Sequence, residues 1–153
     1  MEPIGRDVGT TAKVLGRAFS AALGEAGGSQ PVWLILLALK QQRRRTQQEV
    51  ARAVGIGGPT LTRHLDGLED AGLVVRSRDS EDRRAVRVEL TEQGDAAFLR
   101  LREAAVAFDA RLRTGLAQEE LDRLRELLGR LRSNVAGEEV AEVRSLDAGA
   151  SVR

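Results

Sequence analysis

The first regular pattern along the chain is helical and lies between Thr10 and Leu23. Its apolar residues recur every three to four positions, which places them on one face of an α-helix. The pattern predicts an amphipathic helix that ends near Gly27 and Gly28, because glycine commonly follows a helix end. The apolar face consists of Val14, Leu15, Ala18, Phe19, Ala22 and Leu23.

A second helix is predicted to open at Ser29 and Pro31, residue types that favour the start of a helix. Positions 32–39 are all apolar, so this helix should be buried on nearly every side. A short third helix should begin at Thr46, because Thr46 and Glu49 have the spacing of a capping box. In that motif the two side chains bond each other's backbone amides.

A turn at Gly55 separates the third helix from a fourth, in which Pro59 suits the first turn because no amide donor is needed there. A buried stripe is predicted at Leu61, Leu65 and Leu68, with Gly72 as the C-cap. At ~100° per residue, other side chains of this helix point away from the stripe or flank it. The outward positions are Pro59, Thr60, Arg63, Asp66 and Gly67, and the flanking positions are Thr62 and His64.

Two short stretches, 73–78 and 85–90, partly alternate apolar and polar residues and predict a β-hairpin. The tip of this hairpin carries Asp82, Arg83 and Arg84. Helix, turn, helix and hairpin in this order describe a winged helix-turn-helix, so the expected fold class is mainly α with a small β-hairpin wing (α+β). Two further amphipathic helices are predicted at 91–116 and 118–135, joined by a turn at 115–117.

The apolar stripes of the terminal helices extend beyond what the winged segment can cover, which predicts that they pack against a second copy of the chain. The expected layout is a single domain with dimerisation helices at 10–28 and 91–135 and a winged helix-turn-helix at 30–90. From 136 to 153 the chain is rich in Gly, Glu, Ala and Ser. This composition predicts a weakly packed tail.

Charge is distributed unevenly although the formal net charge is only +1. The segment from Lys40 to Arg87 holds eleven Lys and Arg against seven Asp and Glu, a balance of +4, and the remainder has a balance of −3. The basic excess therefore lies on the winged segment, as expected of a segment that binds nucleic acid. With 153 residues and 42% hydrophobic composition, the chain has room for one compact core.

Several classes of site and location are disfavoured by composition. The chain has no Cys and one His, His64, so no thiol redox centre and no metal site is expected. No cofactor motif or catalytic spacing of carboxylates is present, which argues against an enzyme. The amino terminus lacks the order of a signal peptide, and the longest apolar run, 32–39, is far below the ~20 residues of a membrane helix. A cytoplasmic protein without membrane contact is expected.

The ordered motifs between Trp33 and Gly94 resemble those of the multiple antibiotic resistance regulator (MarR) family of winged-helix transcription factors. They are the buried second helix, the capping Thr46, Leu61-Thr62-Arg63, Leu68-Glu69-Asp70-Ala71-Gly72-Leu73-Val74, Asp82-x-Arg84 and Leu90-Thr91-x-x-Gly94. The resemblance implies a homodimer that binds double-stranded DNA at a pseudo-palindromic operator, most often as a repressor. It also implies release by a small, often phenolic or aromatic, ligand.

Within that resemblance, Arg84 is the residue expected to enter the minor groove, whose negative potential favours a guanidinium. The family pattern pairs the Asp82 carboxylate with this arginine and so orients the wing. Arg83 could contact DNA beside it or be an ordinary exposed residue. The alternative for the whole tip is a solvated salt bridge worth ~0–1 kcal/mol.

Thr60, Thr62 and Arg63 are expected to face the major groove, where arginine can bond guanine and threonine can meet a thymine methyl or a phosphate. Gln47 and Gln48, at the start of the third helix, could approach a phosphate or be surface glutamines. Two readings of Arg76 stay open, a phosphate contact or a partner for the acidic residues of the wing.

The aromatic residues Phe19 and Trp33 could line a ligand pocket, although packing in the core explains them more simply. His64 is better explained by packing than by base contact. The alternative function is a winged-helix module for protein interaction, which needs no arginine at the wing tip. The local +4 balance and Arg84 favour DNA instead.

Overall fold

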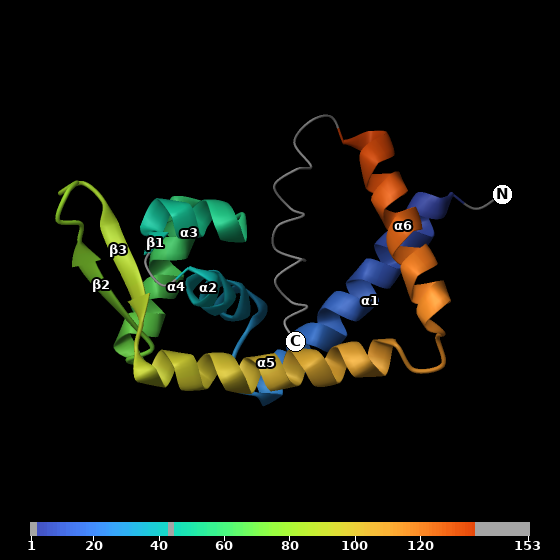
Figure 1. The fold of residues 1–153 in the computed structure, drawn as a ribbon, viewed down its shortest axis with the longest axis horizontal. Coiled ribbons are helices and arrows are strands. Elements are labelled where there is room, and N and C mark those ends of the chain that lie inside the picture. The colour runs from blue at the N-terminus through green and yellow to red at the C-terminus, as the bar shows by residue number, and fades with distance from the viewer. Residues whose placement is uncertain (1–2, 43–44, 137–153) are drawn as a thin grey trace. The chain divides into compact units, whose positions relative to one another are not determined.

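The computed structural model describes residues 3–42 and 45–136, which fall into two compact units with the division after Phe108. The predicted fold class is confirmed, since helices dominate and the strands form one small sheet (Figure 1). Helix α5 continues from the first unit into the second. The elements are α1 (Ile4–Glu25), α2 (Gln30–Gln41), β1 (Arg45–Thr46), α3 (Gln47–Val54), α4 (Gly58–Asp70), β2 (Val74–Arg78), β3 (Val86–Leu90), α5 (Glu92–Leu112) and α6 (Gln118–Val135).

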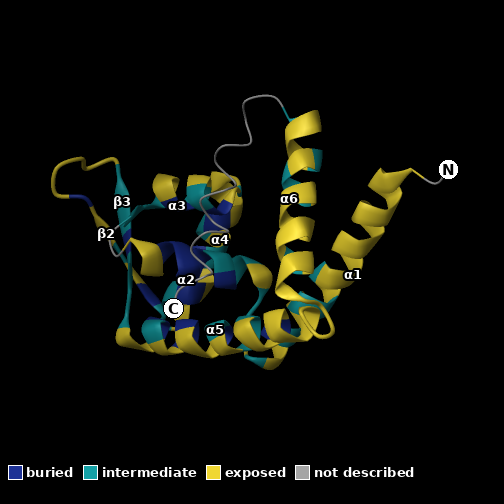
Figure 2. Ribbon diagram, turned by 45° about the vertical axis from the view of Figure 1, so that its right-hand side comes forward, coloured by how far each residue is buried: buried dark blue, intermediate teal, exposed yellow. Residues whose placement is uncertain are grey.

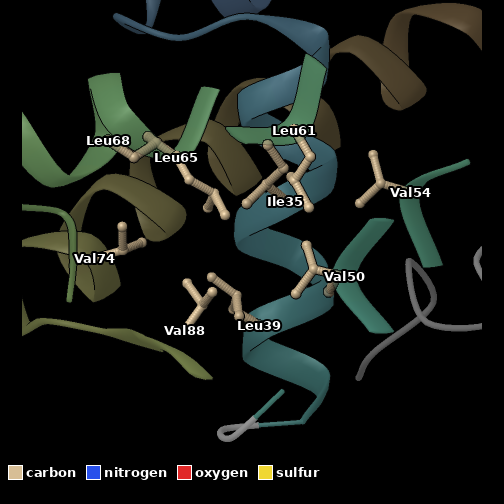
Figure 3. Packing of buried hydrophobic residues seen from close by; sticks show 10 residues of the cluster. Ile35, Leu39, Val50, Val54, Leu61, Leu65, Leu68, Val74 and Val88 are labelled. Carbon is tan, nitrogen blue, oxygen red and sulfur yellow. The ribbon is translucent and has the colours of Figure 1, made fainter. Parts of the chain in front are cut away.

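Helix α2 occupies the centre of the first unit, as its apolar sequence predicts. One side of it, including Ile35 and Leu39, packs against α3, α4 and the sheet (Figure 3). The other side, including Trp33 and Leu36, packs against Leu23 of α1 and residues of α5. Because both sides of α2 are covered, this one helix links the winged segment to the long helices. The first cluster is completed by Ala38, Val50, Val54, Leu61, Leu65, Leu68, Val74 and Val88.

The predicted start and stop signals of the short helices are confirmed. Ser29 caps α2 by accepting from the amide of Val32. Thr46 and Glu49 form both bonds of the capping box at α3, and the amide of Thr46 is the main cause that lowers the pKa of Glu49. Gly55 then ends α3 with φ at 72°, a left-handed conformation that suits glycine.

The sheet has three antiparallel strands in the order β1-β3-β2, one more than the sequence predicts. In the hairpin, Val74 pairs with Leu90 and Arg78 with Val86. Strand β1 pairs Arg45 with Val88 on the other side of β3. A strand of two residues has no alternation to reveal it, so only the pairing with β3 defines β1.

Three boundaries differ from the sequence prediction. Helix α1 begins at Ile4, six residues earlier than expected, and α5 ends at Leu112 rather than near position 116. Helix α4 ends with Ala71 as the C-cap, and Gly72 follows it with φ at 72°. Polar residues at the start of α1 hide its helical period. The earlier end of α5 reflects Gly115, which has φ at 80° and belongs to the turn before α6. The predicted tail at 136–153 lies, apart from its first residue, outside the described residues.

Candidate nucleic-acid interface

The predicted leucine stripe of α4 anchors this helix to the hydrophobic core. Leu61 and Leu65 are fully buried, and Leu68 is 4% exposed. This anchoring leaves Thr60 and Arg63 exposed on the outward face. Among the described residues Arg63 has no ion-pair partner, so its guanidinium is available to a ligand.

Thr62 is half-buried on the flank of α4 and takes part in a short chain of hydrogen bonds. Its hydroxyl donates to the carbonyl oxygen of Gly58 at 3.0 Å and accepts from Nε2 of Gln47 at 2.7 Å. Gln47 therefore joins the start of α3 to the middle of α4. Its neighbour Gln48 is exposed, and no hydrogen bond of its side chain occurs within the described part of the chain.

The loop between β2 and β3 is built around Asp79, which the sequence analysis missed. Asp79 is only 5% exposed, although the loop around it lies in solvent. Its Oδ1 atom accepts from the amides of Glu81 at 2.7 Å and Asp82 at 3.0 Å, and its Oδ2 atom pairs with Nε of Arg87. The amides of Asp82 and Glu81, helped by Arg87, lower the pKa of this carboxyl. Aspartate is a common turn residue because its carboxylate can accept from backbone amides two and three residues further along the chain. This turn signal could have identified Asp79 from the sequence.

Asp82 orders the tip in a different way from the one expected. Its carboxylate accepts from the backbone amide of Arg84 at 3.0 Å. The expected pair between this carboxylate and the Arg84 guanidinium is not formed, and Arg83 and Arg84 are both exposed. No ion pair involves either arginine in the described ranges 3–42 and 45–136. Two aspartates thus fix the loop backbone and leave both tip guanidinium groups unneutralised.

Arg76 is engaged within the protein, but not with acidic residues of the wing. Its guanidinium contacts Glu69 at 2.7 Å and Asp66 at 2.6 Å, and both carboxylates belong to α4. Its backbone amide also donates to Glu69. The guanidinium of Arg76 lowers the pKa of Glu69, and the Glu69 carboxylate in turn raises the pKa of Arg76. Arg76 therefore ties β2 to α4, which argues against a free phosphate contact.

The two aromatic residues suggested for a pocket are packed against other rings. Trp33 is 8% exposed and stacks on Phe98 with ring centroids 5.6 Å apart. Phe19 lies 5.2 Å from Phe108 in a tilted arrangement. Both contacts are typical of an apolar core. His64 is half-buried, and the described residues contain no group of side chains suited to hold a metal.

No single described helix is long and apolar enough to cross a membrane. Helices α1 and α2 meet the requirements of length and apolar composition only when counted together, and they are bent by 74° with respect to each other. Helix α2 is mostly buried in the core.

These elements define the class of the protein. A short helix, a tight turn, a second helix that exposes Arg63 and a hairpin with a basic tip form a winged helix-turn-helix, a DNA-binding fold.

The chain belongs to the MarR family of transcriptional regulators. The family model matches residues 29–86, the segment from the cap of α2 to the start of β3. The transcriptional regulator PA3341 is 34% identical, with a TM-score of 0.71, and the match covers 87% of this chain and 98% of that one.

Two other solved structures are similar in fold. The transcriptional repressor CouR, bound to a 23-mer DNA duplex, is 28% identical with a TM-score of 0.76, and the match covers 84% of this chain and 92% of that one. The organohalide-sensing regulator RdhR-CbdbA1625, in its 2,4-dichlorophenol-bound form, is 20% identical with a TM-score of 0.74. That match covers 86% of this chain and 79% of the regulator.

Proposed function

We propose that this regulator is a homodimeric repressor that binds a pseudo-palindromic operator through two copies of α4 and two wings. The main observation behind this proposal is that the arginines of the winged segment form two groups, those paired with carboxylates and those left unpaired within the described residues. Arg76 and Arg87 are neutralised by carboxylates. Five others are exposed and lack an ion-pair partner in the part of the chain that the structure describes, namely Arg52, Arg63, Arg78, Arg83 and Arg84.

The unpaired arginines favour DNA over a protein as the binding partner. An arginine that has no carboxylate partner within the protein is free to neutralise a DNA phosphate. Each phosphate neutralised in this way releases counterions from the DNA. The hairpin that carries Arg83 and Arg84 projects from the helices of the first unit (Figure 1). An exposed guanidinium at such a tip suits a narrow minor groove. The repressor assignment is supported by the relationship to CouR.

The homodimer is proposed from apolar surface on the terminal helices. In α1, Val14 is 59% exposed, and in α6, Leu124 and Leu127 are 48% and 40% exposed. Figure 2 shows how much of both helices is exposed in a single chain. Apolar side chains repeated along a helix face favour burial against another copy, because water is then released from both surfaces.

Release by a small aromatic or phenolic ligand is the remaining part of the proposal. It is supported by the relative whose structure holds 2,4-dichlorophenol. No ligand is needed for the DNA-binding step itself. The two steps are therefore tested separately.

Selection of bound sequences from a random duplex pool tests the DNA-binding step. The expected result is an inverted repeat with half-sites about one helical turn apart, bound with a salt slope near −0.9 for each phosphate neutralised. Arg84→Ala should weaken binding, whereas Arg111→Ala, an equal loss of charge outside the winged segment, should not. Binding that ignores salt and duplex sequence would contradict the proposal and favour a protein partner.

A further inference from the structure

The hydroxyl of Thr62 has no donor left for an external ligand. A threonine hydroxyl has one hydrogen and two lone pairs. The hydrogen is used on the carbonyl of Gly58, and one lone pair accepts from Gln47. Phosphate oxygens only accept hydrogen bonds, so Thr62 in this arrangement cannot bond a DNA phosphate. Of the two contacts weighed for this residue, the phosphate is thereby excluded.

What Thr62 still presents is its methyl group. The hydroxyl branch of the side chain is turned towards Gly58 and Gln47, and the methyl occupies another branch of the same β-carbon. Thr62 is half-buried, so part of the side chain remains accessible beside the exposed Thr60 and Arg63. In the major groove only thymine carries a methyl group, at C5.

We propose that Thr62 recognises the C5-methyl group of one thymine in each half-site, and that Gln47 is the positioning residue that holds it in this rotamer. The inference rests on the proposed DNA-binding function. Gln47 is suited to the role because its amide crosses from α3 to α4, so it fixes both the side chain and the angle between the helices. Gln48 offers a matched control, since it adjoins Gln47 and has no such bond within the described part of the chain.

The test replaces each operator thymine in turn by uracil, which lacks only the methyl group. One position per half-site should weaken wild-type binding about fourfold, the value for loss of one buried methyl group of ~0.8 kcal/mol. Thr62→Ser keeps the hydroxyl and loses the methyl, so it should bind thymine and uracil equally at that position. Thr62→Val carries a methyl on both branches of its β-carbon, so it should still prefer thymine although it lacks the bond to Gln47.

Gln47→Ala should reduce the thymine preference at the same position. Gln48→Ala should leave that preference unchanged, because loss of a phosphate contact would lower the affinity for the thymine and uracil operators by the same factor. Thermal unfolding of each variant separates loss of recognition from loss of fold. The proposal is overturned if Thr62→Ser discriminates as well as the wild type, if no uracil substitution affects the wild type, or if Thr62→Val binds thymine and uracil equally at that position. Failure of the wild type to select any operator would instead contradict the proposed function itself.

Discussion

Replacing Gly94 by alanine tests how α5 is joined to the winged segment. A β-carbon at this position would lie 2.0 Å from the carbonyl oxygen of Leu73 and 3.0 Å from a methyl of Leu90. Carbon and oxygen rarely approach closer than about 3.3 Å, so the two backbones would have to separate by more than 1 Å, on the order of a bond length. Glycine is required here because of the close backbone approach.

The separation would strain two hydrogen bonds at the same junction. The amide of Thr91 donates to the carbonyl of Leu73 at 3.1 Å, and the Thr91 hydroxyl donates to the carbonyl of Gly72 at 2.6 Å. Losing both costs about 1 kcal/mol each, and the overpacking costs about 2 kcal/mol. Alanine returns about 1 kcal/mol through its higher helix propensity. The expected net destabilisation is about 3 kcal/mol.

Urea unfolding at one fixed protein concentration measures this difference, since the stability of the proposed dimer would depend on concentration. Gly67→Ala is the matched control, because Gly67 lies inside α4 with no atom within 4 Å of the added carbon. It should be neutral or stabilising by up to about 1 kcal/mol. The reasoning is refuted if Gly94→Ala is as stable as Gly67→Ala.

Three further outcomes are expected. Arg63→Ala should cost about 1–3 kcal/mol of operator affinity and relax one base pair per half-site, measured on single-base operator variants, whereas an equal loss on all sequences would assign Arg63 to phosphate. The amide NMR shifts of Glu81 and Asp82 should respond to the titration of Asp79 only at a lower pH than for an ordinary aspartate, because the amides of Asp82 and Glu81 lower the pKa of Asp79. Asp79→Asn should abolish this acid response, and an unchanged response would contradict the assignment. A phenolic ligand that releases the operator should alter the fluorescence of Trp33, the only tryptophan, and no change in either signal would exclude a pocket there.

The parts of the fold that the sequence predicts are those set by local chemistry. The Thr46–Glu49 capping box, the turn at Gly55 and the leucine stripe of α4 each depend on residues a few positions apart, and the structure has all three. Strand β1 depends on pairing across more than 40 positions, Arg45 with Val88, and so has no local signal. Non-local pairing is the information that a single sequence does not display.

The candidate site divides in the same way. Residues that face outward on α4 follow from helical phase, so Thr60 and Arg63 could be placed before the structure. Their partners could not, because an arginine in a sequence does not reveal whether a carboxylate neutralises it. Arg76 and Arg84 are equally basic in sequence, yet Arg76 is held by Asp66 and Glu69 while Arg84 is exposed. The DNA contacts of Thr60, Arg63 and Arg84 stay predictions.

The Arg76 pairing leads to a last prediction about rigidity between α4 and the wing. Glu69 accepts from Nε, Nη2 and the backbone amide of Arg76, whereas Asp66, more exposed, accepts from Nη2 alone. Glu69→Ala should therefore accelerate hydrogen exchange at the Arg76 amide and weaken operator binding, because α4 and the wing would no longer be fixed at one separation. Asp66→Ala should leave that exchange rate nearly unchanged. Equal exchange in the two variants would show that strand pairing alone holds the wing, since β2 keeps its pairing to β3 in both.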